Sequence, residues 1–251
     1  MDTPVIELSN AAIHATPSRG RRRRNIGEAI LSGINMEVYP GELVYLIGKV
    51  GSGKSTLLKA LYGEIPISYG SGRIAGFDLT DLRKREIPFL RRQLGMVFQD
   101  FQLLADRNVY ENMRFVLKAT GWKNETAIRV RIDEILSLVN LNNKVYAMPY
   151  QLSGGEQQRL AVGRAFLNHP DIILADEPTG NLDPETSEDI MSLFIDIIHM
   201  GCSVLLATHN ISLIENFPSR TLRFLNGCVE EIDCISILGL ENRNESNYWQ
   251  Q

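Results

Sequence analysis

The chain of 251 residues has few cysteines, no excess of positive charge and no long apolar run. Its three cysteines, Cys202, Cys228 and Cys234, are scattered and odd in number, which favours reduced thiols over a disulfide framework. No pair of cysteine or histidine residues has the spacing of zinc ligands, so we expect no structural metal site. Because no apolar run approaches about 18 residues, we expect no membrane-spanning helix.

Net charge and composition further narrow the class of protein to which the chain can belong. The formal net charge is −4 at pH 7, so the chain has no overall basic signature for binding nucleic acid. Residues 1–4 contain neither the basic nor the apolar region of a secretory signal, and we expect a cytosolic protein. Hydrophobic residues make up 44% and charged residues 22%, which are ordinary values for a globular domain with a sizeable core.

Strand-like segments alternate with helix-like segments along most of the chain, which predicts an α/β fold with a mostly parallel sheet. Helical spacing over about 109–140, followed by a helical stretch at 154–168, predicts a helical subdomain at about 100–165. One domain is expected over residues 1–240, and the polar tail 241–251 is expected to be loose. The predicted strands are residues 5–8, 34–38, 43–47, 94–98, 172–176, 203–207, 221–225 and 228–232, the last two joined as a hairpin.

Residues 48–56 form the most informative motif. They fit the pattern G-x-x-x-x-G-K-[ST] of phosphate-binding loops, and they follow an apolar strand and precede a helix-like stretch. Glycines let backbone N–H groups turn towards an anion, and the helix start adds partial positive charge. Lys54 can reach the β- and γ-phosphates, and the Ser55 hydroxyl can hold Mg²⁺. The residues predicted to bind a nucleoside triphosphate here are Gly48, Lys49, Val50, Gly51, Ser52, Gly53, Lys54, Ser55 and Thr56.

Two acidic residues, Asp176 and Glu177, follow the apolar segment 172–175. The C-terminal end of this parallel strand faces the same edge as the phosphate loop, so Asp176 can share Mg²⁺ with Ser55. Adjacent strand residues point in opposite directions, which leaves Glu177 as a base or orienting group for an attacking water. A solvated turn is the alternative interpretation of this acidic pair.

The segment 152–159, with the sequence LSGGEQQR, lies between these two motifs. Ser153 can cap the following helix, and the two glycines after it open the helix N terminus to an anion. An ordinary cap explains the same residues, so spacing alone leaves both interpretations open. The sequence LSGGEQ nevertheless resembles the signature motif of ATP-binding cassette (ABC) ATPases. Gln99, residues 180–183 and His209 are similar to the Q-loop glutamine, the D-loop and the switch histidine of that family.

The family resemblance covers about residues 5–232. It implies a P-loop nucleotide-binding domain with a RecA-like core, an N-terminal antiparallel β subdomain and a helical signature subdomain. It also implies ATP and Mg²⁺ as cofactors, and a homodimer on ATP binding, in which the signature of one chain closes on the phosphate held by the other. Its implied catalytic residues are Lys54, Gln99, Glu177 and His209, and its Mg²⁺ residues are Ser55, Gln99 and Asp176. Further nucleotide contacts are implied for Ser153, Gly154, Gly155, Glu156 and Asp183.

The segment 85–112 is similar to the Q-loop region of the FtsE family of cell-division ABC ATPases. This likeness implies an FtsX-like integral membrane partner, a place on the cytoplasmic face of the cell membrane, and control of periplasmic peptidoglycan hydrolases. Residues 174–183 are shared more broadly, so the ATPase of a lipoprotein-releasing or macrolide-export transporter is the alternative. An ABC ATPase acting on nucleic acid or ribosomes is disfavoured by the single cassette and the acidic charge. A non-catalytic scaffold is disfavoured because Lys54, Glu177 and His209 are all present.

Two features depart from the family pattern. His14 stands where the family usually places an aromatic residue, and we expect its imidazole to stack on the adenine. The polar loop after it is a solvated loop in one interpretation and a contact for anionic lipid headgroups in the other. The arginines of that loop are Arg19, Arg21, Arg22, Arg23 and Arg24. The apolar residues around Gln99 predict either subdomain core or a docking groove for the membrane partner, and they are Phe98, Phe101, Leu103 and Leu104.

Overall fold

The computed structural model describes residues 3–14 and 28–232, which form two sheets and a set of helices. One sheet is antiparallel, with the order β2 (Ala29–Val38), β1 (Ile6–His14), β4 (Tyr69–Ile74) and β5 (Phe77–Asp78). The core sheet has the order β10 (Cys228–Ile232), β9 (Arg220–Leu225), β3 (Leu43–Ile47), β8 (Ser203–Ala207), β7 (Ile172–Asp176) and β6 (Leu94–Val97). Its neighbouring strands are parallel except β10 and β9. The mostly parallel core sheet confirms the predicted α/β class.

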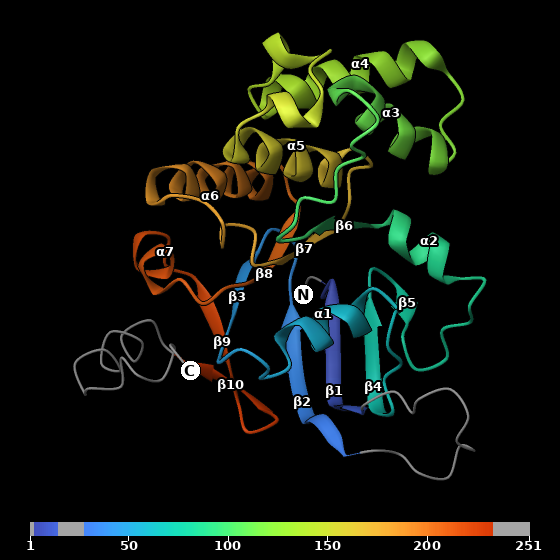
Figure 1. Ribbon diagram of the computed structural model, residues 1–251. Coiled ribbons are helices and arrows are strands. Elements are labelled where there is room, and N and C mark those ends of the chain that lie inside the picture. The colour runs from blue at the N-terminus through green and yellow to red at the C-terminus, as the bar shows by residue number, and fades with distance from the viewer. Residues whose placement is uncertain (1–2, 15–27, 233–251) are drawn as a thin grey trace.

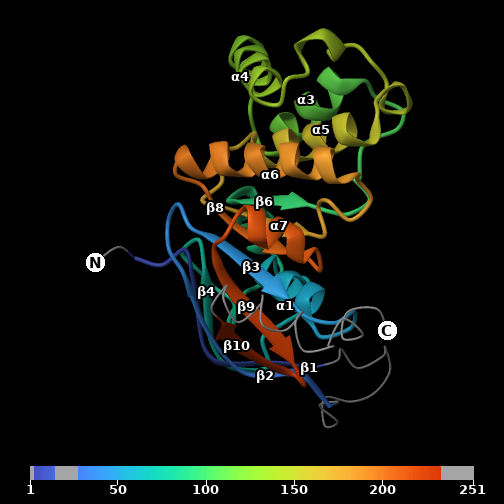
Figure 2. The same cartoon turned by 90° about the vertical axis from the view of Figure 1, so that its left-hand side faces the viewer.

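The molecule has three layers, with the core sheet in the middle (Figures 1 and 2). Helices α5 and α6 cover one face, with α3 and α4 packed on α5 beyond them, and α1 and the antiparallel sheet cover the other face. No helix within residues 3–14 and 28–232 is both long and apolar enough to cross a membrane. The α-helices are α1 (Lys54–Leu61), α2 (Ile87–Arg92), α3 (Val109–Ala119), α4 (Glu125–Leu138), α5 (Gly154–Phe166), α6 (Pro184–His199) and α7 (Ile211–Asn216), and short 3-10 turns lie at Asn142–Lys144 and Pro149–Gln151.

Strand β3 shows why this sequence forms a sheet buried on both faces. All five of its residues are buried. Leu43, Tyr45 and Ile47 pack into the core under the helices, whereas Val44 and Leu46 pack into the core shared with α1, β1 and β2. Successive side chains of a strand point to opposite faces, so a parallel strand covered on both sides needs a continuous apolar run. The run LVYLI meets that need and presents the following loop at the C-terminal end of the strand.

The helical stretch expected over 109–140 is two helices in the structure. Helix α3 ends at Ala119, and Gly121 then adopts a left-handed φ of 104°. Asn124 starts α4, because its side chain accepts hydrogen bonds from the backbone N–H groups of Thr126 and Ala127. The left-handed glycine and the new cap end one helix and begin the next within a few residues.

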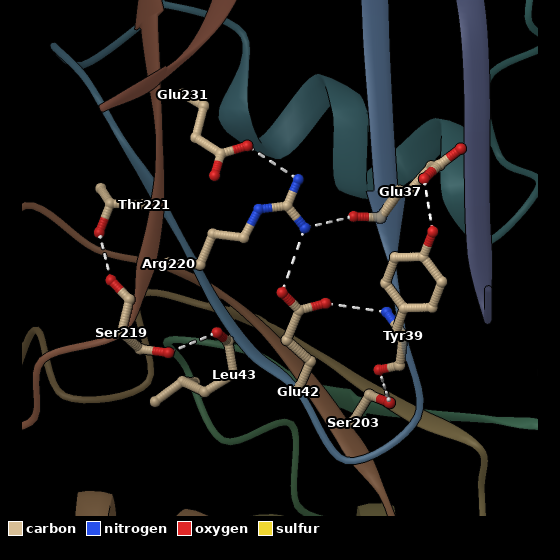
Figure 3. A network of polar contacts seen from close by, with 9 residues as sticks. All are labelled: Glu37, Tyr39, Glu42, Leu43, Ser203, Ser219, Arg220, Thr221 and Glu231. Atoms are coloured by element: carbon tan, nitrogen blue, oxygen red, sulfur yellow. Dashed lines mark hydrogen bonds and ion pairs between the residues drawn. The ribbon is translucent and has the colours of Figure 1, made fainter. Parts of the chain in front are cut away.

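A polar network closes the edge of the core sheet at which β3, β8 and β9 begin (Figure 3). The Arg220 guanidinium donates to the Glu37 carbonyl oxygen at 2.7 Å and to the carboxylates of Glu42 and Glu231 at 3.1 and 2.9 Å. Glu42 also accepts a hydrogen bond from the Tyr39 N–H at 2.8 Å, and the Ser203 hydroxyl donates to the Tyr39 carbonyl at 3.0 Å. Glu37 lies in β2, so this network ties the antiparallel sheet to the core sheet.

Candidate functional site

The opposite edge of the core sheet gathers the predicted site residues. Asp176, at the end of β7, pairs with Ala207, at the end of β8, which also pairs with Leu46 in β3. The loops that leave these three strands therefore start side by side. A shared C-terminal edge of parallel strands is where α/β proteins bind ligands.

The phosphate loop leaves β3 at this edge and enters α1. Gly51 and Gly53 have left-handed φ values of 80° and 107°, which a residue with a Cβ rarely adopts. A Cβ on Gly53 would lie 2.7 Å from the Leu31 side chain. In the described part of the chain no side chain caps the N terminus of α1, which leaves its first N–H groups as donors for a ligand. The loop therefore has the backbone form that binds phosphate at a helix start.

Lys54 opens α1 with its side chain buried, at 7% exposure. Its ammonium donates to the carbonyl oxygens of Gly48 and Lys49 at 2.6 and 3.3 Å, so the side chain folds along the loop. Burial lowers the pKa of Lys54, and the negative charges of Glu177 and Asp176 oppose that shift. The ammonium thus lies between the phosphate loop and the acidic strand end, where it can meet an anionic ligand.

Ser55 and Asp176 come together as predicted from their positions in the sequence. The Ser55 hydroxyl donates to the Asp176 carboxylate at 3.1 Å. No cluster of three or more histidine, cysteine, aspartate or glutamate side chains that could hold a metal occurs in residues 3–14 and 28–232. A single carboxylate beside a hydroxyl fits Mg²⁺, which in nucleotide sites keeps water and phosphate oxygens as most of its ligands.

Gln99 lies against the turn 180–181. Its carbonyl oxygen accepts a hydrogen bond from the Asn181 side chain at 3.4 Å, and its Nε2 lies 3.3 Å from the position of a Cβ on Gly180. Within the described residues, no hydrogen bond joins Gln99 to Ser55 or Asp176. The predicted role of Gln99 at Mg²⁺ therefore stays a prediction.

Glu177 and His209 form the second polar pair of this edge. His209 Nδ1 lies 2.9 Å from the Glu177 Oε2 atom, with the Glu177 side chain 17% exposed and the His209 side chain 54% exposed. Glu177 has a left-handed φ of 49°, and its N–H donates to the Ala207 carbonyl at 2.9 Å. Left-handed backbone at a glutamate is strained, and such strain is characteristic of functional positions. The pair can orient a water molecule and accept its proton.

The signature segment forms a capping box at the start of α5. The Glu156 N–H donates to the Ser153 hydroxyl at 3.2 Å, and the Ser153 N–H donates to the Glu156 carboxylate at 2.8 Å. This backbone bond, with Lys144 nearby, lowers the pKa of Glu156. Gly154 stands next in the chain, and a Cβ on Gly155 would lie 2.5 Å from the Thr186 side chain. The ordinary cap that the sequence left open is present, and it leaves the glycine N–H groups at the helix start.

Asp183 caps the neighbouring helix α6. It accepts hydrogen bonds from the Thr186 N–H at 2.9 Å and from the Thr186 hydroxyl at 2.7 Å, and these bonds lower its pKa. Helix α5 packs into the core on one face of the sheet and α1 into the core on the other. The signature and the phosphate loop of one chain therefore belong to opposite layers, which Figure 1 shows.

His14 ends β1 and pairs with Ala29. The preceding residue, Ile13, pairs with Leu31, whose side chain fills the space beside Gly53. His14 thus lies one step beyond the strand pair that packs on the phosphate loop, and its buried Nδ1 has no hydrogen-bond partner among residues 3–14 and 28–232. Stacking on adenine stays a prediction. The arginines at 19 and 21–24 and the tail 241–251 lie outside the described residues.

Sequence reasoning missed two residues of this region. Asn181 contacts Gln99, and Arg164 of α5 donates to the carbonyl oxygens of Phe101 and Gln102. Asn181 lies inside the predicted D-loop, so its motif was a signal. Arg164 is a basic residue in an amphipathic helix, and nothing in that pattern distinguishes it from a solvated side chain.

Comparison with known proteins identifies the family. Residues 31–180 match the model of the ABC transporter family. The chain is 44% identical over 203 residues to the cell division ATP-binding protein FtsE of Streptococcus pneumoniae serotype 2, covering 81% of this chain and 88% of the relative. The FtsE protein of Escherichia coli K12 is 46% identical over 201 residues, covering 80% and 90%.

Comparison with solved structures leads to the same family. A dimeric, post-hydrolysis state of the ATP-binding cassette MJ0796 bound to ADP and Pi is 32% identical, with a TM-score of 0.77 and coverage of 91% of this chain and 98% of that one. A further dimeric structure of MJ0796, a bacterial ABC transporter cassette, is 33% identical with the same TM-score and coverage. The chain belongs to the ABC transporter family of ATPases, and within it the chain is similar to the FtsE cell-division proteins.

Proposed function

We propose that this ABC ATPase is the ATP-hydrolysing subunit of an FtsEX-like membrane complex of cell division. Membership of the family implies ATP hydrolysis, Mg²⁺ and a membrane partner in general. The Glu177–His209 contact of 2.9 Å at the phosphate-loop edge is the observation that carries the hydrolytic part. The names of relatives that are 42–46% identical support the cell-division part.

In this proposal, the residues of the edge divide the work of hydrolysis. The loop N–H groups and Lys54 bind the β- and γ-phosphates. Glu177 accepts the proton of the attacking water. The water oxygen bonds to the γ-phosphorus, and the bond between the γ-phosphorus and the leaving ADP oxygen breaks. His209 holds the Glu177 carboxylate in place through their 2.9 Å contact. Ser55, Asp176 and Gln99 would hold Mg²⁺, which neutralises phosphate charge when bound.

A complete site requires two copies of the chain in this proposal. Each chain has one phosphate loop and one signature, and the two belong to opposite layers. Two-fold pairing lets each signature, with Ser153, Gly154, Gly155 and Glu156, close on the nucleotide of the other chain. Asp183 lies at the start of α6 beside this signature, since its partner Thr186 packs on Gly155.

The membrane partner would be FtsX-like and would place the ATPase on the cytoplasmic face of the cell membrane, where it controls periplasmic peptidoglycan hydrolases. We place the docking groove near Gln99. The apolar residues there are half-buried, and Leu103 packs against the helical core. Leu103 therefore serves the core, whereas Phe98, Phe101 and Leu104 remain for docking.

Co-purification from membranes of the source cells tests the partner. We expect the full chain to retain an FtsX-like permease, and Phe101→Asp to lose it while keeping ATPase activity. Met200→Asp is the control, because Met200 is an apolar residue that is 59% exposed and lies at the C-cap of α6. Recovery of a lipoprotein-releasing or macrolide-export permease would support the alternative function and overturn the cell-division role.

A further inference from the structure

The segment after Gln99 contains two consecutive non-glycine residues with left-handed backbone. Phe101 has a φ of 57° and Gln102 a φ of 49°. Residues with a Cβ disfavour this region, so two in succession are strained unless neighbouring groups hold them. The hydrogen bonds inside the segment run from the Gln102 N–H to the Asp100 carbonyl at 2.6 Å and from the Phe101 N–H to the Phe98 carbonyl at 3.4 Å. They leave the carbonyl groups of Phe101 and Gln102 free to bind another element.

Arg164 supplies the contact from outside the segment. Its Nη1 donates to the Gln102 carbonyl oxygen at 2.5 Å and its Nη2 to the Phe101 carbonyl oxygen at 2.8 Å. The guanidinium is a planar fork with parallel donors, so one side chain can fix both carbonyls in one geometry. Burial lowers the pKa of Arg164, but an arginine stays charged in a protein. The strained segment is therefore held by a charged group on a neighbouring helix.

Arg164 lies at the far end of the signature helix. Helix α5 begins at the cap residue Ser153 and carries Arg164 in its last turn. At about 1.5 Å of rise per residue, the two ends of this rod are roughly 15 Å apart. One end presents the signature, and the other holds the two residues that follow Gln99 and Asp100 in the chain. A movement of α5 therefore reaches the Gln99 segment through one side chain.

We propose that Arg164 is a positioning residue that holds the segment 101–102 in its left-handed form and thereby couples the signature helix to Gln99. The inference rests on the proposed role of Gln99 in hydrolysis. Arg164 does not touch the nucleotide in this account. Its loss would displace Gln99 and slow turnover, while the phosphate loop would still bind ATP.

Two substitutions distinguish a role of Arg164 in positioning Gln99 from a role in the stability of the fold alone. Arg164→Lys keeps the charge but replaces the fork by a single ammonium group. Arg131→Lys is the matched control, because Arg131 also donates to two backbone carbonyl groups, those of Leu167 and Phe166, at 2.9 and 2.8 Å. Arg131 is buried, at 8% exposure, but its acceptors are carbonyl groups at the end of α5 and not those of the segment 101–102.

Steady-state ATPase assays of the full chain, with melting temperatures, give the readout. We expect Arg164→Lys to lower kcat by about 10- to 100-fold with KM for ATP nearly unchanged, as a misplaced group does. We expect Arg164→Lys and Arg131→Lys to lower the melting temperature by similar amounts. Arg131→Lys should leave kcat per folded chain unchanged. A normal kcat in Arg164→Lys, or an equal loss of kcat in both variants, would overturn the proposal.

The substitution Gln102→Gly provides an independent test, because glycine adopts left-handed backbone without strain. The Gln102 side chain is exposed, and its carbonyl group is kept in the variant. We expect Gln102→Gly to restore part of the lost kcat when added to Arg164→Lys and to have little effect in the parent chain. No recovery in the double variant would contradict the idea that Arg164 offsets backbone strain.

Glu177→Gln separates this inference from the proposed function. If Glu177→Gln is inactive while Arg164→Lys turns over normally, the hydrolytic site stands and the inference about Arg164 fails. If Glu177→Gln keeps full activity, the proposed catalytic site itself fails.

Discussion

The two edges of the core sheet are built in opposite ways. At the edge where β3, β8 and β9 begin, Arg220 joins Glu37, Glu42 and Glu231 in a network of partners within the chain. At the edge where β3, β7 and β8 end, the structure has an uncapped helix start and a strained, left-handed Glu177. Satisfied polar groups stabilise one conformation, whereas strained or open groups at an edge are retained for a ligand. The first edge holds the fold, and in our proposal the second edge performs the hydrolysis.

The largest effect should come from Lys54→Ala at the second edge. The Lys54 ammonium is the buried positive charge next to Gly48 and Lys49 of the loop, so its removal should abolish ATP hydrolysis and strongly weaken ATP binding. Phosphate release and nucleotide titration check both results. Wild-type turnover in this variant would exclude the phosphate loop as the site at which ATP is hydrolysed.

Glu177→Gln should have the next largest effect. The amide keeps a hydrogen-bonding oxygen for His209 but cannot accept a proton from water, so we expect hydrolysis to fall by about 10²- to 10⁴-fold. ATP binding should persist, because Asp176 and Ser55 are unchanged. Single-turnover assays with saturating ATP measure the loss, and a rate near that of the wild type would exclude Glu177 as the base.

Arg220→Met tests the first edge. The variant keeps most of the side-chain length but loses the three hydrogen bonds of the guanidinium, and Arg220 is 25% exposed. We expect the free energy of unfolding to fall by at least about 1.5–3 kcal/mol, the range for a single hydrogen bond to a charged group. Chemical denaturation measures the change, and kcat per folded chain should stay the same. A loss of kcat without a loss of stability would show that the two edges are not separate in function.

The smallest effect should come from His14 at the rim of the second edge. Stacking on a base contributes about 1–3 kcal/mol for an aromatic side chain, and we expect the imidazole to lie near the lower limit. His14→Ala should weaken nucleotide binding slightly, and His14→Tyr should strengthen it. Equal affinities of the three proteins in calorimetry would mean that another residue holds the adenine.

The sequence was most informative where one physical requirement dominates. The strand LVYLI is buried on both faces, so its continuous apolar run predicted a parallel strand. The hairpin at Asn226 and Gly227 was predictable because asparagine and glycine readily adopt the positive φ that such a turn requires. Their φ values in the structure are 50° and 77°. The phosphate loop and the acidic residues at 176 and 177 were predictable because binding phosphate and Mg²⁺ requires these residue types at these positions.

Other features depend on contacts between distant segments and carry little local signal. Strand β4, with the sequence YGSGRI, is mostly exposed and rich in glycine, so it forms through pairing with β1. The contact between Arg164 and residues 101–102 spans more than sixty positions of the chain. Tertiary packing decides both, and periodicity within a short window does not contain that information.

The most direct test of the account is the mass of the Glu177→Gln protein in solution with Mg-ATP, measured by light scattering. If the second edge is completed by the signature of another copy, ATP should convert this variant from the 28.2 kDa chain to a particle of twice that mass. Adding Ser153→Phe, which places a bulky side chain at the signature, should keep the same protein monomeric. A Glu177→Gln protein that binds ATP and remains a monomer would contradict the shared site.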